Sequence, residues 1–478
     1  MIDLLDRDAT AQLAALASKQ ISAVELLKAA LARHAETHEA LNAVIAADPE
    51  RALERARAID DARSRNEVLG PLAGLPMTVK DTFDVVGLPA SSGLADLRRR
   101  QAEDAAAIAH ARQSGAVIWG KTNVPVMAAD WQSVNAAYGR TNNPWDLART
   151  PGGSSGGAAA ALAARVTPLE IGSDIGGSLR VPASFCGVFS HKPTWGAVSQ
   201  RGHVPPHPGS HAERDLNVIG PMARSPRDLR MLLAILQNGP LAPRAPPADL
   251  KETRIGLWLD DANCPLDPEV RATIEAFAGQ LSQAGATVEP IKSPVDMRAL
   301  LFAYQTLLGA VLGEDLPPKM VRGLEWARLF AKGALRRGAG PLSSAAMAMA
   351  YTARHREWMA ADAVRARLRH EIGETFETWD AILAPIAPVP AFPHDARPFA
   401  RRSLTLSGGE TIPYASMLTW ISLATALHLP ATAVPAGRTP AGLPVGVQLI
   451  GPIGGDSRTL AIAQAIDEDV RGFEPPPL

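Results

Sequence analysis

Apolar residues recur at helical spacing in two parts of the chain. In VELLKAALARHAETHEAL, residues 24–41, leucine and alanine follow this period, and Ser22 and Glu25 have the spacing of a capping box. The pattern predicts a helix that begins after Ser22 and covers a sheet with its apolar face. Residues 300–370 show mostly the same helical pattern.

Short apolar runs punctuated by glycine and proline predict strands between these helices. The first two are GLPMTVK, residues 74–80, and AVIWGKT, residues 116–122. A helix end followed by a strand is predicted at 281–291, and further short strands at 377–392 and 429–451. Alternating strands and helices favour an α/β fold with helices packed on a central sheet.

Two features of this pattern have more than one interpretation. The proline-rich stretch Pro240 to Pro247 is either a linker between two domains or one long surface connection. Large apolar side chains within the helical region either pack a helical layer, which we favour, or form the wall of a substrate pocket. These side chains are Trp326, Phe330, Met347, Met349, Tyr351 and Trp358.

The 478-residue chain is 46% hydrophobic and nearly neutral, with 48 basic and 49 acidic residues. This composition is ordinary for a globular protein and gives no reason to expect nucleic-acid or membrane binding. Cys186 and Cys264 lack the spacing of a disulfide framework or a zinc site. No signal-peptide pattern opens the chain, so we expect a cytoplasmic protein.

Lysine is rare in this chain, with nine lysines against 39 arginines. Lys80 ends the apolar run GLPMTV, so the predicted strand places it at the edge of the buried interior. Burial lowers the pKa of a lysine, and a neutral lysine can accept a proton from serine. Considered alone, however, a lysine at a strand end is usually a surface residue.

Two glycine- and serine-rich loops occur within residues 150–187. The first, Gly152 to Gly157, opens an alanine-rich helix, whose N–H groups would suit an anionic or polar group. The second, Ile175 to Ser178, has small side chains, so its N–H groups can converge on one oxygen. This second loop predicts an oxyanion hole.

Three other interpretations of the first loop remain. A phosphate-binding loop needs lysine and then serine or threonine after the second glycine, but Ala158 follows here. Residues 152–156 match the GxSxG of a nucleophile elbow, although neither His191 nor His428 has a context that marks it as the base. The glycines could also simply close a turn, but the recurring serines argue against this.

Several motifs together resemble one known family. GLPMTVKD, GKTNVP, GGSSGG, GSDIGGSLRVPASFCG and HKPTWG follow one another in this order, and the strand segments near the C-terminus continue the similarity. The chain thus closely resembles the amidase signature family, serine hydrolases with a Ser-Ser-Lys triad. The resemblance implies one α/β domain over residues 1–478, with a central mixed β-sheet flanked by α-helices, a signature core at about 70–225 and a helical substrate-facing region at about 295–410.

The resemblance also implies roles for the serines and for Lys80. Ser178 is the expected nucleophile, Ser154 the bridging serine after a cis peptide bond from Gly153, and Lys80 the base, with spacings of 74 and 24 residues. Neutral Lys80 would take a proton from Ser154 while Ser154 takes one from Ser178. Ser178 would then attack the carbonyl carbon, and water would hydrolyse the acyl-enzyme.

The backbone N–H groups of Ile175, Gly176, Gly177 and Ser178 would hold the oxyanion in that mechanism. No metal, nucleotide or other cofactor is required.

Neighbouring residues are expected to support the site. Ser155 would tune the relay by hydrogen bonding, and Asp174 and Arg180 would hold the nucleophile loop through an ion pair. Cys186, in an apolar FCG context, is expected to be a core residue instead of a nucleophile.

Three histidines in HVPPHPGSH, His203, His207 and His211, are spaced four residues apart. The prolines between them prevent a helix that would present them on one face, so we expect no metal site.

Departures from the family pattern bear on the substrate. Val126, Met127 and Ala128 stand where subunits of the tRNA-dependent amidotransferase typically show an acidic residue and phenylalanine, and Ala197 stands where they usually show arginine. We therefore predict a stand-alone amidase in which Met127, Ala128 and Ser154 contact the substrate and residues 127–131 line an acyl pocket. Apolar or aryl amides are the expected substrates, with carbamates and esters as extensions.

The main alternative is a glutamine amidotransferase subunit that acts with a partner protein. A nucleotide-binding protein and a non-enzymatic binding module are weaker alternatives. For the stand-alone enzyme we expect a monomer or homodimer.

Overall fold

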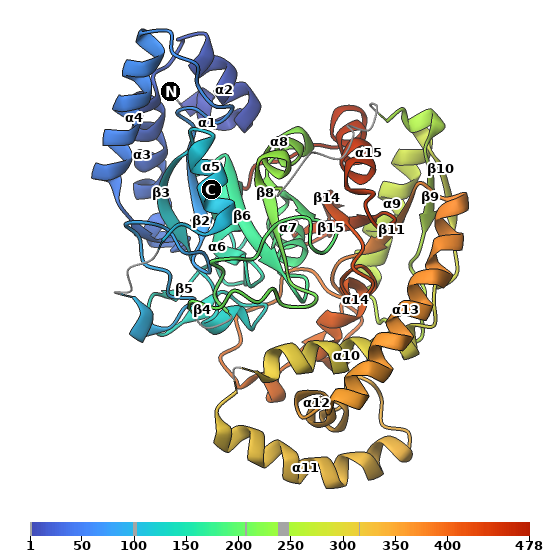
Figure 1. The fold of residues 1–478 in the computed structure, drawn as a ribbon. Coiled ribbons are helices and arrows are strands. Elements are labelled where there is room, and N and C mark those ends of the chain that lie inside the picture. The colour runs from blue at the N-terminus through green and yellow to red at the C-terminus, as the bar shows by residue number, and fades with distance from the viewer. Residues whose placement is uncertain (1, 99–102, 206–207, 238–247, 315) are drawn as a thin grey trace.

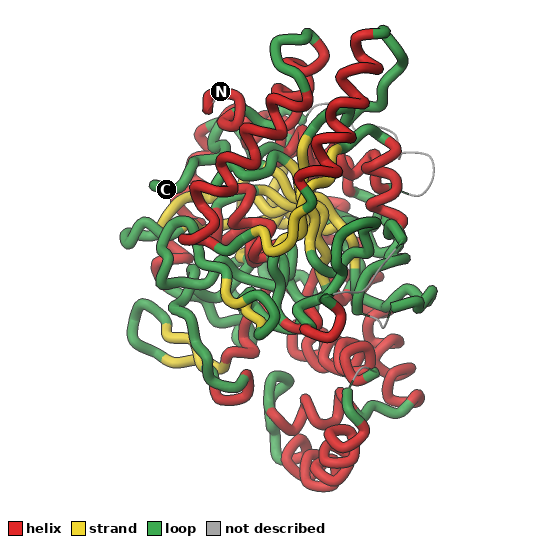
Figure 2. The backbone as a smooth tube through the Cα atoms, turned by 90° about the vertical axis from the view of Figure 1, so that its left-hand side faces the viewer, coloured by secondary structure: helices red, strands yellow, loops and turns green. Residues whose placement is uncertain are grey.

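Figure 1 shows a computed structural model that describes residues 2–98, 103–205, 208–237, 248–314 and 316–478. The proline-rich stretch at 240–247 lies outside the described residues. Strands gather at the centre, and helices and loops surround them (Figure 2).

The larger sheet has eight strands in the order β10-β9-β11-β15-β14-β7-β8-β6. The β10, β9 and β11 strands are parallel, and the other pairs are antiparallel, so the predicted mixed sheet is confirmed. The strands are β6 (Leu169–Asp174), β7 (Phe189–Lys192), β8 (Val218–Ala223), β9 (Arg254–Leu257), β10 (Thr287–Pro290), β11 (Ala381–Pro385), β14 (Ala431–Arg438) and β15 (Pro444–Ile450).

A second sheet of three strands lies beside the edge strand β6. It contains β1 (Val44–Ala47), β3 (Val117–Thr122) and β2 (Pro76–Lys80) in that order. Thr78 on β2 donates a hydrogen bond of 2.5 Å to the Glu170 carboxylate on β6, which joins the two sheets. Two small hairpins complete the strands: β4 (Val134–Asn135) with β5 (Gly139–Arg140), and β12 (Ser403–Thr405) with β13 (Thr411–Pro413).

The predicted N-terminal helix is α3 (Ala23–Leu41), and its capping box is present. Ser22 Oγ accepts from the Glu25 N–H at 3.1 Å, while the Glu25 carboxylate accepts from the Ser22 N–H at 2.9 Å. This helix packs on β2, with Leu26, Leu27 and Leu41 buried. Its neighbours at this end of the molecule are α1 (Ile2–Asp6), α2 (Ala9–Ala17) and α4 (Pro49–Ser64) (Figure 1).

The remaining helices fall into a group that packs around the sheets and a separate helical layer. The first group is α5 (Ala106–Gln113), α6 (Gly156–Ala163), α7 (Arg180–Cys186), α8 (Pro226–Leu236), α9 (Pro268–Gln283), α14 (Thr419–Ala426) and α15 (Asp456–Asp469). The layer is α10 (Met297–Gly313), α11 (Pro318–Arg336), α12 (Ser344–Tyr351) and α13 (His355–Thr378). In Figure 1, α11 lies lowest and α13 rises from this layer along the right-hand side. Short 3-10 helices occupy Ala95–Leu97, Val126–Ala128, Leu250–Glu252, Phe399–Arg401 and Tyr414–Leu418.

The helical prediction for 300–370 is confirmed, but its apolar side chains do not share one environment. Trp326 and Phe330 on α11 are 73% and 78% exposed, so the prediction that they pack within the layer is wrong. Met347 and Tyr351 instead line a cavity. In the described part of the chain, no helix has the length and apolar character needed to cross a membrane.

Candidate active site

Lys80 lies at the junction of the two sheets, at the end of β2, and is fully buried. Its Nζ lies 2.7 Å from Ser154 Oγ, which belongs to the first glycine-rich loop. Two further oxygens, both from Ser173 on β6, lie 2.9 Å (Oγ) and 3.4 Å (carbonyl) from Nζ. The structure therefore brings together the predicted base and the predicted bridging serine.

Burial controls the charge of Lys80. Desolvation lowers the pKa of Lys80 to about 7, although the carboxylates of Asp174 and Glu170 oppose the shift. Near pH 7 a large share of the molecules consequently carries a neutral amine at this position. Such an amine has a lone pair that can accept the proton of a serine hydroxyl.

The first loop, residues 152–157, uses its N–H groups within the protein. Gly156 donates to Ser133 Oγ at 3.1 Å, and Gly157 donates to the Asn123 carbonyl at 3.2 Å. The expectation that this helix end holds an anionic or polar group is thus not supported. The Gly153–Ser154 peptide bond is cis, in agreement with the family resemblance.

The second loop is held against the first and against the helical layer. Ser155 N–H donates to the Ser178 carbonyl at 3.2 Å, which links the two loops. Tyr304 on α10 donates its hydroxyl to the Ile175 carbonyl at 2.8 Å. Because C=O and N–H point in opposite directions across a trans peptide, this contact turns the Gly176 N–H away from Tyr304.

Gly177 differs from its expected role. Its N–H donates to Asp174 Oδ1 at 2.8 Å, so it is not available to an oxyanion in this structure. The N–H groups of Ile175, Gly176 and Ser178 have no acceptor among the described residues. Of the four donors predicted for an oxyanion hole, these three are available in this structure.

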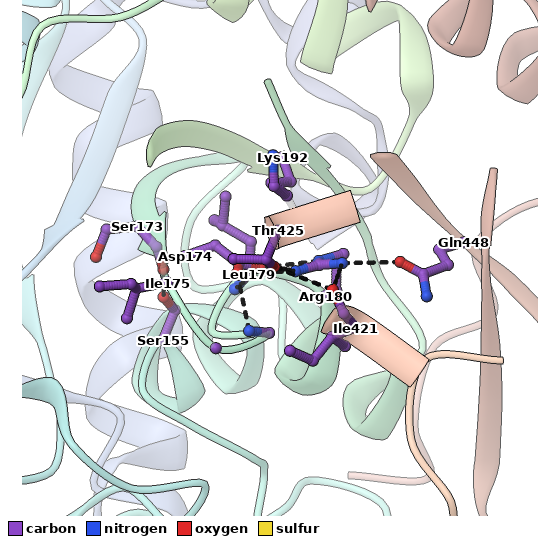
Figure 3. A network of polar contacts seen from close by, with 12 residues as sticks. Ser155, Ser173, Asp174, Ile175, Leu179, Arg180, Lys192, Ile421, Thr425 and Gln448 are labelled. Carbon is purple, nitrogen blue, oxygen red and sulfur yellow. Dashed lines mark hydrogen bonds and ion pairs between the residues drawn. The ribbon is translucent and has the colours of Figure 1, made fainter. Parts of the chain in front are cut away.

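Asp174 and Arg180 form the predicted ion pair beneath the second loop (Figure 3). Arg180 Nε and Nη2 each lie 3.0 Å from an Asp174 oxygen, and both side chains are fully buried. Burial alone would raise the pKa of Asp174, but the charge and hydrogen bonds of Arg180 lower it overall. Arg180 also donates to Gln448 on β15 and Thr425 on α14, which anchors the loop to the larger sheet.

Ser178 borders two cavities, whose walls also share Ala128, Ile175 and Leu312. The larger has a volume of about 510 Å³ and is walled by the helical layer and by Ala128 to Trp131. Its apolar side chains include Leu308, Leu312, Leu316, Met320, Leu324, Met347, Phe399 and Leu418. The smaller, about 30 Å³, is lined in part by polar residues, which are Ser154, Ser173, Ser178, His203, Arg214 and Asn217.

The predicted substrate residues lie at these cavities. Met127 borders the small cavity, and Ala128 borders both. Residues 128–131 line the larger cavity, in which the acyl group was expected.

Sequence reasoning missed Ser173, which contacts Lys80, and Tyr304, which orients the second loop. Ser173 directly precedes Asp174 in the GSDIGGS motif, and its place in that motif could have identified it as a site residue. No motif marked Tyr304, because it comes from a helix 126 residues beyond Ser178.

Cys186 is buried in the core as predicted, and burial raises the pKa of its thiol, which disfavours a nucleophilic role. Among the described residues, no cluster of three or more histidine, cysteine, aspartate or glutamate side chains could hold a metal ion.

The chain is similar to known proteins over almost its whole length. Residues 25–460 match the family described as Amidase. The chain is 32% identical, over 98% of its length and 96% of the relative's, to a glutamyl-tRNA(Gln) amidotransferase subunit from Acidothermus cellulolyticus.

Two solved structures have similar folds. A crystal structure of an amidase shares 28% identity at a TM-score of 0.78, with 97% of this chain and 99% of that chain covered. A substrate complex of 6-aminohexanoate cyclic dimer hydrolase shares 27% identity at a TM-score of 0.77, with 98% of each chain covered. The chain belongs to the amidase family, the amidase signature enzymes that its motifs resemble.

Proposed function

We propose that this protein cleaves amide C–N bonds through an acyl-enzyme on Ser178. Lys80 in its neutral form accepts a proton from Ser154, and Ser154 accepts one from Ser178 as Ser178 attacks the carbonyl carbon. The 2.7 Å contact between Lys80 and Ser154, with both side chains buried, supports this relay. A relay run in reverse delivers the proton to the leaving amine, and water then hydrolyses the acyl group.

Backbone N–H groups stabilise the oxyanion in this proposal. Ile175, Gly176 and Ser178 supply the donors, and Tyr304 and Trp131 keep the loop in place through its carbonyls. Trp131 Nε1 donates to the Gly176 carbonyl at 2.8 Å from one wall of the cavity. Donors fixed before the substrate arrives need no reorganisation during the reaction.

The large cavity beside Ser178 is the observation that carries the substrate class. It offers about 510 Å³ of space walled mainly by leucine, methionine and aromatic side chains, which suits an apolar or aryl acyl group. Ser154, the proton donor to the leaving amine, borders the adjoining small cavity. Carbamates and esters present the same carbonyl geometry and are further candidate substrates.

A second candidate is a glutamine amidotransferase subunit. Relatives of that name, such as the one from Salinispora tropica, are 33% identical over the whole chain. Glutamine also has a primary amide, so the same nucleophile and relay would serve. In this case a partner protein would receive the released ammonia, and the polar residues around Ser178 would hold the glutamine.

Turnover of purified protein without a partner separates the two candidates. We expect the protein to hydrolyse primary amides and anilides of aromatic and aliphatic acids, with glutamine a poor substrate. Ser178→Ala is the control and should remove all turnover. If glutamine is the only amide that the protein hydrolyses, or if activity depends on a partner protein, the amidotransferase is favoured instead.

A further inference from the structure

The surroundings of Lys80 determine where its lone pair points. A neutral amine has two N–H donors and one lone pair. Two of the three oxygens near Nζ belong to Ser173, and the third is the hydroxyl of Ser154. If both N–H groups are directed at Ser173, the lone pair is left for the Ser154 proton.

The hydroxyl of Ser173 could also form the opposite hydrogen bond with Nζ, because a hydroxyl both donates and accepts. A Ser173 hydroxyl that donated to Nζ would occupy the lone pair that the relay needs. Its orientation is therefore decisive for the base.

His203 sets that orientation. Its Nε2 lies 2.8 Å from Ser173 Oγ, and its Nδ1 lies 2.7 Å from the Pro205 carbonyl oxygen. A carbonyl only accepts, so Nδ1 must carry the hydrogen. In a neutral ring Nε2 is then an acceptor, and it draws the hydroxyl hydrogen of Ser173 away from Lys80.

The ring is neutral mainly because it is buried. Burial and the charge of Lys80 lower the pKa of His203 to about 3. The edge-to-face contact with Phe83, at 5.2 Å between ring centroids, holds the ring in this pocket.

We propose that His203, acting through Ser173, is a positioning residue that aims the lone pair of Lys80 at Ser154. This inference rests on the proposed function of Lys80 as the base. His203 itself touches neither substrate nor nucleophile in this role.

Two substitutions test the arrangement. Ser173→Ala removes the hydroxyl, and His203→Phe keeps a ring against Phe83 but removes the acceptor. We expect each to lower kcat by roughly 10- to 100-fold with KM changed less than about threefold, since the base is misaimed and the acyl cavity is intact. Ser190→Ala is the matched control, because Ser190 is also a buried serine of the larger sheet.

The pH profile distinguishes positioning from a packing defect. Charged or titratable groups around Lys80 are Asp174 and Glu170 from β6 and His203 from its loop, while Lys121 and Arg214 face His203. Without the Ser173 hydroxyl as an acceptor, the protonated amine of Lys80 is less stable, so the pKa of Lys80 falls. In Ser173→Ala the acid limb of the pH–rate profile should therefore move to lower pH, and the plateau rate should also fall. A packing defect would lower the rate without moving that limb.

A double-mutant cycle gives the sharpest test. Because His203 acts through Ser173, adding His203→Phe to Ser173→Ala should change kcat less than about twofold. His203→Gln, whose side-chain oxygen can accept from Ser173, should recover part of the loss. Thermal unfolding checks that each variant folds.

The positioning role would be overturned if the loss of kcat in the double variant equals the product of the two single losses. It would also be overturned if the single variants keep the wild-type kcat. If Ser178→Ala retains turnover, the proposed function itself fails. If Ser178→Ala is inactive while the cycle is additive, only the role of His203 fails.

Discussion

The charge of Lys80 predicts how turnover depends on pH. With the ordinary lysine pKa of 10.5, only about 3 in 10⁴ molecules would hold a neutral amine at pH 7. Burial lowers the pKa to about 7, so about half of the molecules are competent at that pH. Desolvation at the end of β2 thus increases the neutral fraction of Lys80 at pH 7 roughly 10³-fold.

The assay is kcat/KM for one primary amide from pH 5 to 9. Protonated Lys80 is inactive, so the rate should rise about tenfold per pH unit below pH 7 and level off above it. In Lys80→Met the rate should fall by at least ~10³-fold, and any residual activity should lose this limb.

Stability gives a second measure of the same shift. The unfolded chain holds the Lys80 proton up to about pH 10.5, whereas the folded protein releases it near pH 7. The resulting penalty to the free energy of folding, on the order of 5 kcal/mol, is fully present below pH 7 and disappears above about pH 10.5. Urea unfolding of Lys80→Met against wild type should therefore favour the variant at pH 6 and favour it less at pH 10. A flat pH–rate profile, or an acid limb that persists in Lys80→Met, would refute the reasoning.

Three further predictions follow from single contacts. Cys186→Ala should keep kcat/KM within about twofold, because the thiol is buried and inert; a loss similar to that of Ser178→Ala would contradict this. Arg180→Met leaves Asp174 buried and unpaired, so urea unfolding should show a loss of about 3–5 kcal/mol, and an unchanged midpoint would refute the anchoring role. Met347→Trp narrows the large cavity, so kcat/KM should fall about tenfold for bulky aryl amides but not for acetamide, and equal effects would place the acyl group elsewhere.

Local pattern predicted the elements that carry the base and the two loops. The apolar run before Lys80 predicted a strand, and β2 ends at that residue. Pattern could not predict that β2 lies beside β6, because that contact joins segments about 90 residues apart. Ser173 was overlooked and His203 was considered only as a metal ligand for this reason: their contacts depend on neighbours that only the fold supplies.

The errors also have physical causes. Glycine composition indicates that N–H groups can converge, but it does not show which of them a nearby side chain will occupy. The Asp174 carboxylate takes the Gly177 N–H, and Ser133 takes that of Gly156. Aromatic residues of α11 show the same limit, because a helical pattern does not reveal that Trp326 and Phe330 are exposed among the described residues.

Covalent labelling of Ser178 tests the central claim most directly. The protein is treated with a fluorophosphonate, digested, and analysed by mass spectrometry alongside Ser178→Ala and Cys186→Ala. The account predicts one adduct, on the peptide that contains Ser178, in wild type and in Cys186→Ala, and none in Ser178→Ala. An adduct of the same yield in Ser178→Ala, or wild-type labelling at Ser154 or Cys186 instead, would contradict an acyl-enzyme on Ser178.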